Sequence, residues 1–423
     1  MVRPGDCFVA MPGEKVDGHD YVIRAAELGA ACLLIARPVT APGAPVVQVP
    51  DPLLALGQLG RHHRSQFAIP VVGITGSVGK TTTKEMIAAV LSRRFAVFRT
   101  PGNLNSEVGL PVALMDLTAQ HQAAVLEMGM RALGEIEYLV SIAQPTVGVV
   151  TNVGPTHLEL LGSLANIAMA KSELIRGLPA GGTAVLNADD PRVAQMAGVA
   201  PGPVWFYGLT AAHKGEYWVT AADVRREGES GQRFTLVTAA GTADAYLPAP
   251  GQHNVLNAMA AVAVGLGLGL TLDEVAAGVA DYVPSGNRMR IIHQQGIRIL
   301  DDTYNAAPAS VTAALQVMRE MAGTLGRCIA VLGSMFELGV AAEDGHRQVG
   351  EEAARQADRV LTVGDLARHI AAAAGPKAIH FERKEQVVAA LQALLQPGDT
   401  VLVKGSRGMA MEEIVQSLQQ HLA

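Results

Sequence analysis

The sequence predicts an α/β protein of three domains, and three observations support this. A chain of 423 residues is too long for one ordinary core, and typical domain sizes divide it into about three units. From residue 69 onward, short apolar runs alternate with helical patterns, which is typical of a parallel sheet covered by helices. The composition agrees, because 49% hydrophobic residues with 45 glycines and 22 prolines favour sheets joined by many tight turns.

The first predicted domain, residues 1–69, is a small α/β unit. Its second helical pattern begins well, because Asp51 can cap the helix and Pro52 at the first helical position loses no hydrogen bond. Apolar runs are expected at residues 7–10, 31–36 and 46–49. One helical pattern, residues 19–29, lies between the first two runs, and a longer one, residues 51–67, follows the third.

The second predicted domain, residues 70–285, combines a mostly parallel sheet with an antiparallel flap. Between residues 204 and 247 the alternation gives way to successive strands, which predicts the flap, and an alanine-rich helix beginning near His253 closes the domain. The break Pro284-Ser285-Gly286 ends it. The parallel strands are expected at residues 71–75, 96–99, 123–127, 146–151 and 183–187.

The third predicted domain, residues 286–423, has the same alternation and resembles a Rossmann-like unit. Each expected strand is followed by a helical pattern, which predicts helices on the faces of another parallel sheet. The strands are expected at residues 297–300, 328–332, 359–363, 378–380 and 400–404.

Charge and hydropathy exclude two classes of protein. The net charge of −6, without a cluster of lysine and arginine, argues against a nucleic-acid partner. The start of the chain has no basic segment followed by an apolar one, so no signal peptide is expected. The longest apolar stretch, residues 258–270, is shorter than the roughly 20 residues that span a bilayer, so no membrane insertion is expected.

The three cysteines lack the spacing of a metal site or a redox pair. Cys7, Cys32 and Cys328 are odd in number and far apart in sequence, so we interpret them as reduced core residues of a cytosolic protein. We expect the protein to be cytoplasmic and monomeric.

Residues 71–85, VVGITGSVGKTTTKE, form the most informative segment of the chain. An apolar strand leads into a glycine-rich turn and then a helix, so backbone N–H groups and the positive helix end can bind phosphate. Lys80 can reach the β- and γ-phosphates of a nucleotide, and the Thr81 hydroxyl can ligate Mg²⁺. Because Ile74 replaces the first glycine of a general Walker A loop, the predicted ATP loop consists of Thr75, Gly76, Ser77, Val78, Gly79, Lys80, Thr81 and Thr82.

Two further polar residues follow predicted strands. Glu127 ends an apolar strand beside the loop, at the edge where ligands bind in parallel sheets, and an acid there can hold the Mg²⁺ of a nucleotide. His157 follows the strand at residues 146–151. The residues alone leave open a solvated carboxylate at Glu127 and an ordinary loop histidine at His157.

These three segments, in this order and spacing, resemble the central ATPase domain of the Mur ligases. The patterns E-M-G-M-x-x-x-G-E-I and H-L-E-x-x-G-S-x-x-x-I-x-x-A-K-x-E-L are similar to the family members that add D-alanyl-D-alanine. The resemblance implies that Glu127 and His157 ligate Mg²⁺ and that Lys171 is carbamylated, which would give it oxygen ligands. The alternative for Lys171 is a solvated helix lysine.

The resemblance extends over nearly the whole chain and assigns four amide side chains. In TPGNLNSEVGLPVAL, Asn103 and Asn105 are expected to face a muramoyl-peptide substrate. In GQHNVLNAMAA, Asn254 and Asn257 are expected to contact the nucleotide base. Without the resemblance, the first pair would be turn residues and the second pair residues at a helix start.

In the third domain the resemblance implies that two residues, Arg288 and Asp302, reach the ATP, so that this domain closes on the second. A loop near the C-terminus is a carboxylate pocket for the incoming dipeptide or an ordinary turn between strand and helix. That loop contains Lys404, Ser406 and Arg407. The resemblance also implies substrate contacts for Tyr304 and Asn305, which follow the strand at residues 297–300. The family has aspartate where this chain has Ser334.

The resemblance implies an ATP-dependent ligase of the EC 6.3.2 type. It would activate the carboxylate of UDP-N-acetylmuramoyl-tripeptide as an acyl phosphate, and D-alanyl-D-alanine would then attack this group. The alternatives are a ligase that adds the third amino acid, which typically has a D-N-P-R stretch absent here, and, less favoured, a folylpolyglutamate synthase.

The first domain is expected to bind the UDP-sugar, and it departs from the family pattern. A D-[ST]-R element is expected ahead of residues 2–6, and the sequence begins after it, so this domain is truncated relative to the pattern. A non-ligating ATP-binding relative is the alternative that this departure favours.

Overall fold

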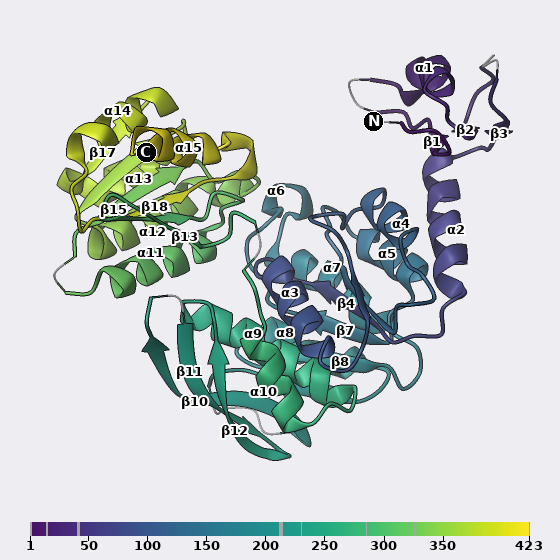
Figure 1. Ribbon diagram of the computed structural model, residues 1–423, viewed down its shortest axis with the longest axis horizontal. Coiled ribbons are helices and arrows are strands. Elements are labelled where there is room, and N and C mark those ends of the chain that lie inside the picture. The colour runs from purple at the N-terminus through teal and green to yellow at the C-terminus, as the bar shows by residue number, and fades with distance from the viewer. Residues whose placement is uncertain are drawn as a thin grey trace.

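The computed structural model describes residues 2–13, 16–39, 43–210, 215–229, 231–284, 286–324 and 326–422. Three sheets form in these ranges, one in each predicted domain, so the predicted α/β fold with three domains is confirmed. Figure 1 shows the N-terminal and C-terminal domains standing on either side above the central domain. Ser285, at the predicted break, lies outside the described residues.

The N-terminal domain is a parallel sheet with a helix on one face. Its strands are β1 (Cys7–Val9), β2 (Cys32–Ile35) and β3 (Val46–Gln48), and its helices are η1 (Gly18–Tyr21) and α1 (Val22–Glu27). The residues that pack under α1 include Leu33 and Ile35, which alternate along β2 with residues of the other face.

The interpretation of the cysteines as core residues is wrong for two of them. Cys328 is buried, but Cys7 is exposed and Cys32 is half-buried. These two are paired in register on β1 and β2, and they alternate with the residues that pack under α1. Both cysteines open their strands, on the face of this small sheet that α1 does not cover, and this position leaves them accessible to solvent.

Helix α2 (Pro52–Ser65) connects the N-terminal domain to the central domain and packs against the latter. Its predicted start is confirmed, because Asp51 Oδ1 accepts hydrogen bonds from the Leu53 and Leu54 amides at 2.8 and 3.0 Å. Gly60 faces Pro111 so closely that a Cβ on it would lie 2.9 Å from the Pro111 Cα.

Nine strands in the described part of the central domain form one sheet, in the order β12-β11-β10-β9-β8-β7-β4-β6-β5. Its parallel strands are β4 (Val71–Thr75), β5 (Val97–Arg99), β6 (Ala123–Glu127), β7 (Val147–Val150), β8 (Thr183–Asn187) and β9 (Val204–Tyr207). The predicted flap is confirmed for β10 (Tyr217–Glu227), β11 (Gly231–Thr238) and β12 (Gly241–Leu247), which are antiparallel and extend this sheet. The prediction is wrong for residues 204–207, because β9 pairs in parallel with both β8 and β10.

Helices cover both faces of the central sheet, and each face has its own apolar core. One core includes side chains of α3 (Lys80–Leu91), α9 (Gln252–Gly267) and α10 (Leu272–Ala280). The other includes side chains of α4 (Gly109–Leu114), α5 (Glu135–Ala143) and α7 (Leu164–Arg176). Shorter helices are α6 (Leu158–Leu161), α8 (Pro191–Ala194) and η2 (Gln195–Val199). Among the described residues, no helix is long and apolar enough to cross a bilayer.

The C-terminal sheet has the order β13-β14-β18-β15-β16-β17. Its strands are β13 (Arg290–Gln294), β14 (Ile297–Asp301), β15 (Cys328–Gly333), β16 (Arg359–Val363), β17 (Ala378–Phe381) and β18 (Thr400–Lys404). One face packs on α11 (Pro308–Ala322), α12 (Ala342–Gln356) and α13 (Ala367–Ala374), and the other on α14 (Lys384–Leu394) and α15 (Glu412–His421). The short helices are η3 (Gly339–Ala341), η4 (Gly375–Lys377) and η5 (Arg407–Met409).

The antiparallel edge strand β13 was not predicted. It forms a hairpin with β14 through Gln295 and Gly296, which both have positive φ, at 48° and 76°. A two-residue turn of this kind is the commonest hairpin connection, so Gln295-Gly296 is the sequence feature that could have revealed the strand.

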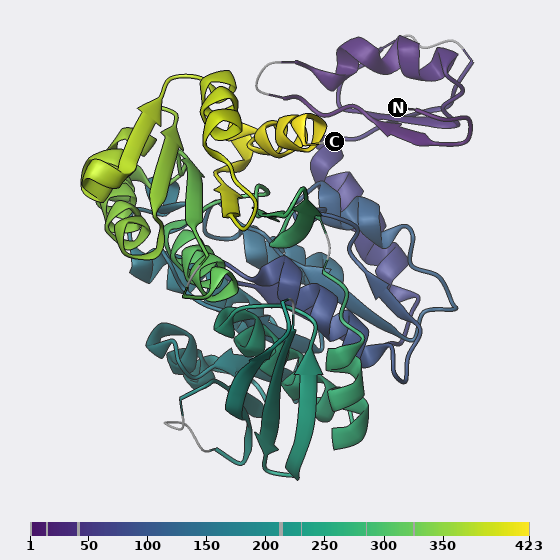
Figure 2. The ribbon, with the colours of Figure 1, turned by 60° about the vertical axis from the view of Figure 1, so that its left-hand side comes forward.

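The hairpin of β10 and β11 forms a second contact between the central and C-terminal domains. Glu229 pairs with Arg298 and with His293, whose Nε2 lies 2.8 Å from Glu229 Oε2. Arg226 donates to the backbone carbonyl of Glu320. Figure 2, from another side, also shows the C-terminal domain directly above the central one.

Gly60→Ala should destabilise the packing of α2 on the central domain. Alanine favours helix by up to about 1 kcal/mol over glycine, but overpacking against a backbone atom costs about 1–3 kcal/mol. We therefore expect a net loss in the free energy of unfolding, measured by urea denaturation. Gly198→Ala, where a Cβ would meet no atom within 4 Å, is the control. A Gly60→Ala protein at least as stable as the wild type would contradict the close packing.

Candidate active site

The turn between β4 and α3 presents backbone N–H groups to a cleft. Gly79, the residue before α3, has φ of +84° and no side chain caps the helix, so the first-turn amides stay open to a ligand. Gly76 is needed for a different reason, since a Cβ there would lie 1.8 Å from Thr151 Oγ1. The sequence pattern thus produces the local geometry of a phosphate loop.

Asn152 holds this loop from the neighbouring strand end. Its side-chain oxygen accepts from the Val78 amide at 2.9 Å, and its carbonyl accepts from the Ser77 amide at 3.0 Å. The Thr151 hydroxyl adds a 2.7 Å bond to the Val78 carbonyl. Sequence reasoning missed Asn152, although its place directly after a buried strand was the available indication.

Lys80 is the first residue of α3, and its side chain turns back onto the loop that precedes this helix. Its ammonium donates to the Gly76 carbonyl at 2.8 Å. Burial lowers the pKa of Lys80, the Glu127 carboxylate opposes this shift, and Arg288 adds to it. A half-buried lysine at a helix N-terminus is suited to bind phosphate oxygens.

The buried carboxylate of Glu127 joins two loops. Its Oε2 accepts from the Thr81 hydroxyl at 2.7 Å, and its Oε1 accepts from the Asn105 amide at 2.6 Å. The Glu127 backbone N–H donates to Thr100 Oγ1 at 3.1 Å. The helix that follows the phosphate loop and the loop that carries Asn105 are therefore fixed to one carboxylate.

Arg288 of the C-terminal domain contacts the Thr81 hydroxyl that is bonded to Glu127. Its Nη2 donates to the Thr81 hydroxyl at 3.0 Å, and its guanidinium carbon lies 3.8 Å from the centre of the Tyr304 ring. Stacking on an aromatic face holds a guanidinium without neutralising it. Arg288 is thus held beside the phosphate loop by residues of both domains.

His157 and Lys171 line the cleft near the interface of these domains. His157 Nδ1 lies 2.7 Å from Glu337 Oε2, and both residues have positive φ, 55° and 64°. Burial lowers the pKa of His157, with Glu337 opposing and Lys80 adding to the shift.

The Lys171 side chain is 1% exposed, and its ammonium has no hydrogen-bond partner among the described residues. Burial, and next the charge of Lys80, lower the pKa of Lys171 well below its usual range. Because Lys171 lines the cleft, its amine is accessible to a ligand or to a modifying reagent.

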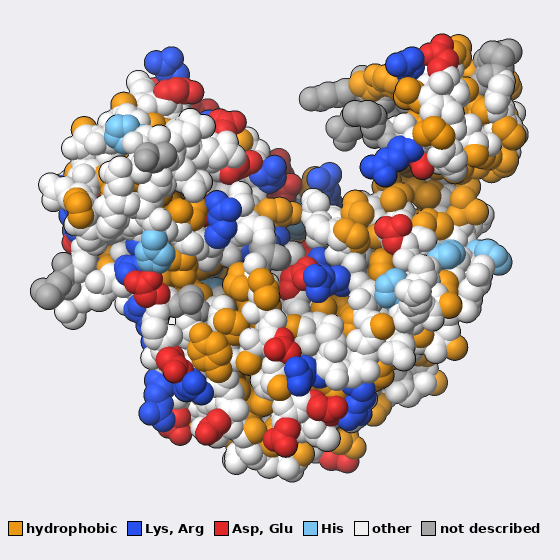
Figure 3. Space-filling model, in the orientation of Figure 1, with side chains coloured by type: hydrophobic (Ala, Val, Ile, Leu, Met, Phe, Trp, Pro, Cys, Tyr) orange, Lys and Arg blue, Asp and Glu red, His pale blue; other side chains and the backbone are white. Residues whose placement is uncertain are grey.

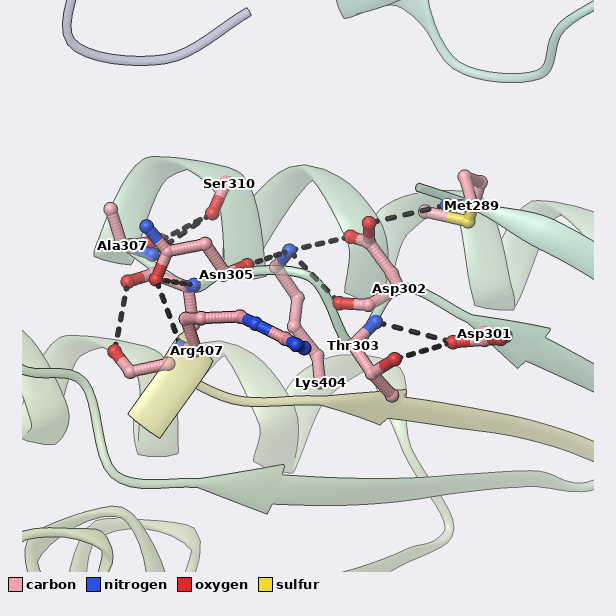
Figure 4. Close-up of polar contacts among 11 residues, drawn as sticks. Met289, Asp301, Asp302, Thr303, Asn305, Ala307, Ser310, Lys404 and Arg407 are labelled. Carbon is pink, nitrogen blue, oxygen red and sulfur yellow. Dashed lines mark hydrogen bonds and ion pairs between the residues drawn. The ribbon is translucent and has the colours of Figure 1, made fainter. Parts of the chain in front are cut away.

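Lys404 is held inside the C-terminal domain, as Figure 4 shows. Its ammonium donates to Asp302 Oδ2 at 2.6 Å and to the Asn305 carbonyl at 2.8 Å. Asn305 Oδ1 in turn accepts from the Arg407 amide at 3.3 Å. In this arrangement Lys404 fixes the loop of Asp302 and Asn305, while the exposed Arg407 side chain pairs with Glu412.

The other predicted polar residues have local partners. Asn254 Nδ2 donates to the Pro250 carbonyl at 2.7 Å, and Asn257 Oδ1 accepts from the Thr83 hydroxyl at 3.3 Å. Ser406 Oγ accepts from the Phe336 amide at 2.8 Å. Ser334, in place of the expected aspartate, is buried, and its hydroxyl accepts from the Ala367 amide at 3.3 Å.

One cleft of about 850 Å³ collects these groups at the meeting of the central and C-terminal domains. All predicted site residues except Thr75, which ends β4, line it. Figure 3 shows the hollow that the N-terminal and C-terminal domains leave above the central domain. In the described ranges no three His, Cys, Asp or Glu side chains gather as a metal site, so a cation here would need other ligands too.

Comparison with known families agrees with this geometry. Residues 74–265 match the Mur ligase middle domain, residues 287–407 match the Mur ligase glutamate ligase domain, and residues 1–64 match the Mur ligase family catalytic domain. The chain belongs to the Mur ligase family. This Mur ligase is 41% identical to the UDP-N-acetylmuramoyl-tripeptide–D-alanyl-D-alanine ligase of Escherichia coli (strain K12), over 99% of this chain and 92% of the relative.

Solved Mur ligases have the same fold. MurF from Acinetobacter baumannii has a TM-score of 0.92 at 34% identity, covering 99% of this chain and 91% of that one. MurF from Thermotoga maritima in complex with ADP has a TM-score of 0.89 at 30% identity, covering 100% and 96%. A UDP-N-acetylmuramoyl-L-alanyl-D-glutamate–2,6-diaminopimelate ligase, at 19% identity and a TM-score of 0.59, shares the fold alone.

Acid should weaken the fold through His253, which lines the cleft. Burial lowers the pKa of His253 to about 4, with Asp302 opposing and Lys404 adding to the shift. In the unfolded chain this pKa is about 6.5, so between pH 6.5 and 4 the unfolded state binds more protons and the free energy of unfolding falls as the pH falls. Linkage gives a loss of about 2 kcal/mol between pH 7.5 and 5.

Urea unfolding of the wild type and of His253→Gln at both pH values measures this contribution. The variant should lose about 2 kcal/mol less than the wild type over the same change of pH. An equal loss in the two proteins would show that His253 is not held neutral in the fold.

Proposed function

We propose that the chain is the ATP-dependent ligase that joins D-alanyl-D-alanine to UDP-N-acetylmuramoyl-tripeptide in peptidoglycan synthesis. It forms a C–N bond, as ligases of the EC 6.3.2 type do. The observation that carries the proposal is the single cleft where the phosphate loop, the Asn105 loop and Arg288 of the C-terminal domain meet. Full-length similarity to ligases of that name supports the choice of substrates.

The reaction requires no nucleophilic side chain. A carboxylate oxygen of the tripeptide attacks the γ-phosphorus of ATP, which releases ADP and leaves an acyl phosphate. The amine of D-alanyl-D-alanine then attacks the acyl carbon, phosphate leaves with the electron pair of the C–O bond, and the amine loses a proton. Positioning and charge neutralisation supply the acceleration in such transfers.

Different residues of the cleft bind the phosphates, the tripeptide, the base of ATP and the dipeptide. Lys80 and the open amides of α3 bind the phosphates, and Arg288 adds a cation from the C-terminal domain. Asn103 and Asn105 orient the tripeptide, and Asn254 and Asn257 contact the base of ATP. In the C-terminal domain, which accepts the dipeptide and closes over the ATP, the proposed residues are Asp302, Tyr304, Asn305, Lys404, Ser406 and Arg407.

Mg²⁺ fits the oxygen-rich side of the cleft. The Thr81 hydroxyl and the Glu127 carboxylate lie 2.7 Å apart, which provides two adjacent oxygen ligands. His157 and a carbamate on Lys171 would complete the set. The metal would neutralise phosphate charge as the phosphoryl group is transferred.

We place the domain boundaries after residues 69 and 285, and we propose a cytoplasmic monomer whose first domain binds the UDP-sugar. A ligase that adds the third amino acid is the second candidate, but the sequence DDTYNAAP stands where D-N-P-R would be expected.

Phosphate release from ATP, with product mass read in the same tube, tests the proposal. We expect release and a pentapeptide product only when UDP-N-acetylmuramoyl-tripeptide and D-alanyl-D-alanine are present together. Turnover of the UDP-dipeptide with lysine or diaminopimelate instead would identify the second candidate. A protein that binds ATP but releases no phosphate with either pair would be the non-ligating relative.

Carbamylation of Lys171 has its own test. Because CO₂ reacts with a neutral amine, the lowered pKa of Lys171 favours the carbamate near neutral pH. With ¹³C-bicarbonate we expect a carbamate carbon signal by NMR that grows as the pH rises through this lowered pKa. Lys171→Met should lose the signal and Lys377→Met, in the C-terminal domain, should keep it. A spectrum without the signal in the wild type would contradict the carbamate.

A further inference from the structure

Lys84 is a buried lysine that the proposed reaction does not use. It lies on α3, one helical turn after Lys80, and its side chain is 0% exposed. Lysine is rarely buried to this extent unless its charge is paired. The contacts of its ammonium therefore need to be identified.

Three acceptors surround the ammonium of Lys84. It donates to the Thr100 carbonyl at 2.7 Å and to the Gly102 carbonyl at 3.1 Å. It also lies 3.2 Å from Glu85 Oε1, and the other oxygen of Glu85 lies 3.1 Å from Arg99 Nε. An ammonium has three N–H donors, so each has an acceptor within reach.

Both carbonyls belong to the loop that leads to Asn105. Thr100 Oγ1 accepts from the Glu127 amide, and Asn105 Nδ2 donates to the Glu127 carboxylate at 2.6 Å. The Asn105 carbonyl accepts from the Gly129 amide at 2.8 Å. The loop is therefore held to β6 near both ends, and Lys84 holds its first part to the helix of the phosphate loop.

We propose that Lys84 is a positioning residue that sets the Asn105 loop against the phosphate loop. It links the helix that carries Lys80 and Thr81 to the loop that carries Asn103 and Asn105. The orientation of the tripeptide carboxylate toward ATP therefore depends on this contact. The inference rests on the proposed function, since it takes these asparagines as the residues that bind the tripeptide.

The variant Lys84→Met tests this, because methionine keeps a similar apolar stem and removes the donors. We expect kcat/KM for UDP-N-acetylmuramoyl-tripeptide to fall on the order of 100-fold, as small misplacements of bound groups do. The dissociation constant of ADP, measured by calorimetry, should change less than about twofold, because the phosphate loop is held separately by Asn152.

Lys377→Met is the matched control. Lys377 also donates to two backbone carbonyls, those of Ala354 and Ala357 at 2.7 and 3.0 Å, but in the C-terminal domain. Its variant should lose thermal stability without a change in kcat/KM. Lys84→Gln, which keeps one donor group, should show a smaller loss than Lys84→Met and serves if the latter does not fold.

A double-variant comparison separates positioning from general damage. If Lys84 acts through Asn105, adding Lys84→Met to Asn105→Ala should lower kcat/KM no further. Independent, multiplying losses would overturn the proposal, and so would an equal weakening of ADP and tripeptide binding. Calorimetric binding of the tripeptide gives the same comparison without turnover, so an inactive wild type would refute the proposed function and leave Lys84 still tested.

Discussion

The carboxylate of Glu127 is the interaction on which the site depends. One of its oxygens accepts a hydrogen bond from Thr81 and the other accepts one from Asn105. One buried carboxylate therefore fixes the phosphate loop and the Asn105 loop together. The parallel sheet makes this possible, because the carboxyl ends of β4 and β6 meet at one edge. Arg288 connects these residues to the C-terminal domain, because it donates a hydrogen bond to the Thr81 hydroxyl.

Two lysines with lowered pKa values line the cleft, Lys80 and Lys171. Burial lowers the pKa values of both Lys80 and Lys171, the charge of Lys80 lowers the pKa of Lys171 further, and the charge of Arg288 lowers that of Lys80. Anionic ligands relieve this repulsion, since a nearby negative charge favours the protonated amine. The same burial makes Lys171 a better amine for reaction with CO₂. One local environment thus supports both ATP binding and the proposed modification.

Local sequence rules predicted the parts of the molecule that local physics determines. The cap of Asp51, the strand–loop–helix around Lys80 and the antiparallel flap were found as expected. The approach of Arg288 to the phosphate loop followed from the family resemblance, but other contacts between distant segments were not predicted, because no short pattern encodes them. The bracing of the phosphate loop by Asn152 and the exposure of Cys7 depend on which strands become neighbours and which face a helix covers.

We propose that the phosphoryl group of ATP passes to the tripeptide carboxylate within this cleft. Labelling that carboxylate with ¹⁸O and following the label into product tests it most directly. We expect one ¹⁸O atom in each phosphate released and one in the new amide, because the bridging oxygen of the acyl phosphate leaves with the phosphate. Unlabelled phosphate released alongside the ligated product would contradict the account.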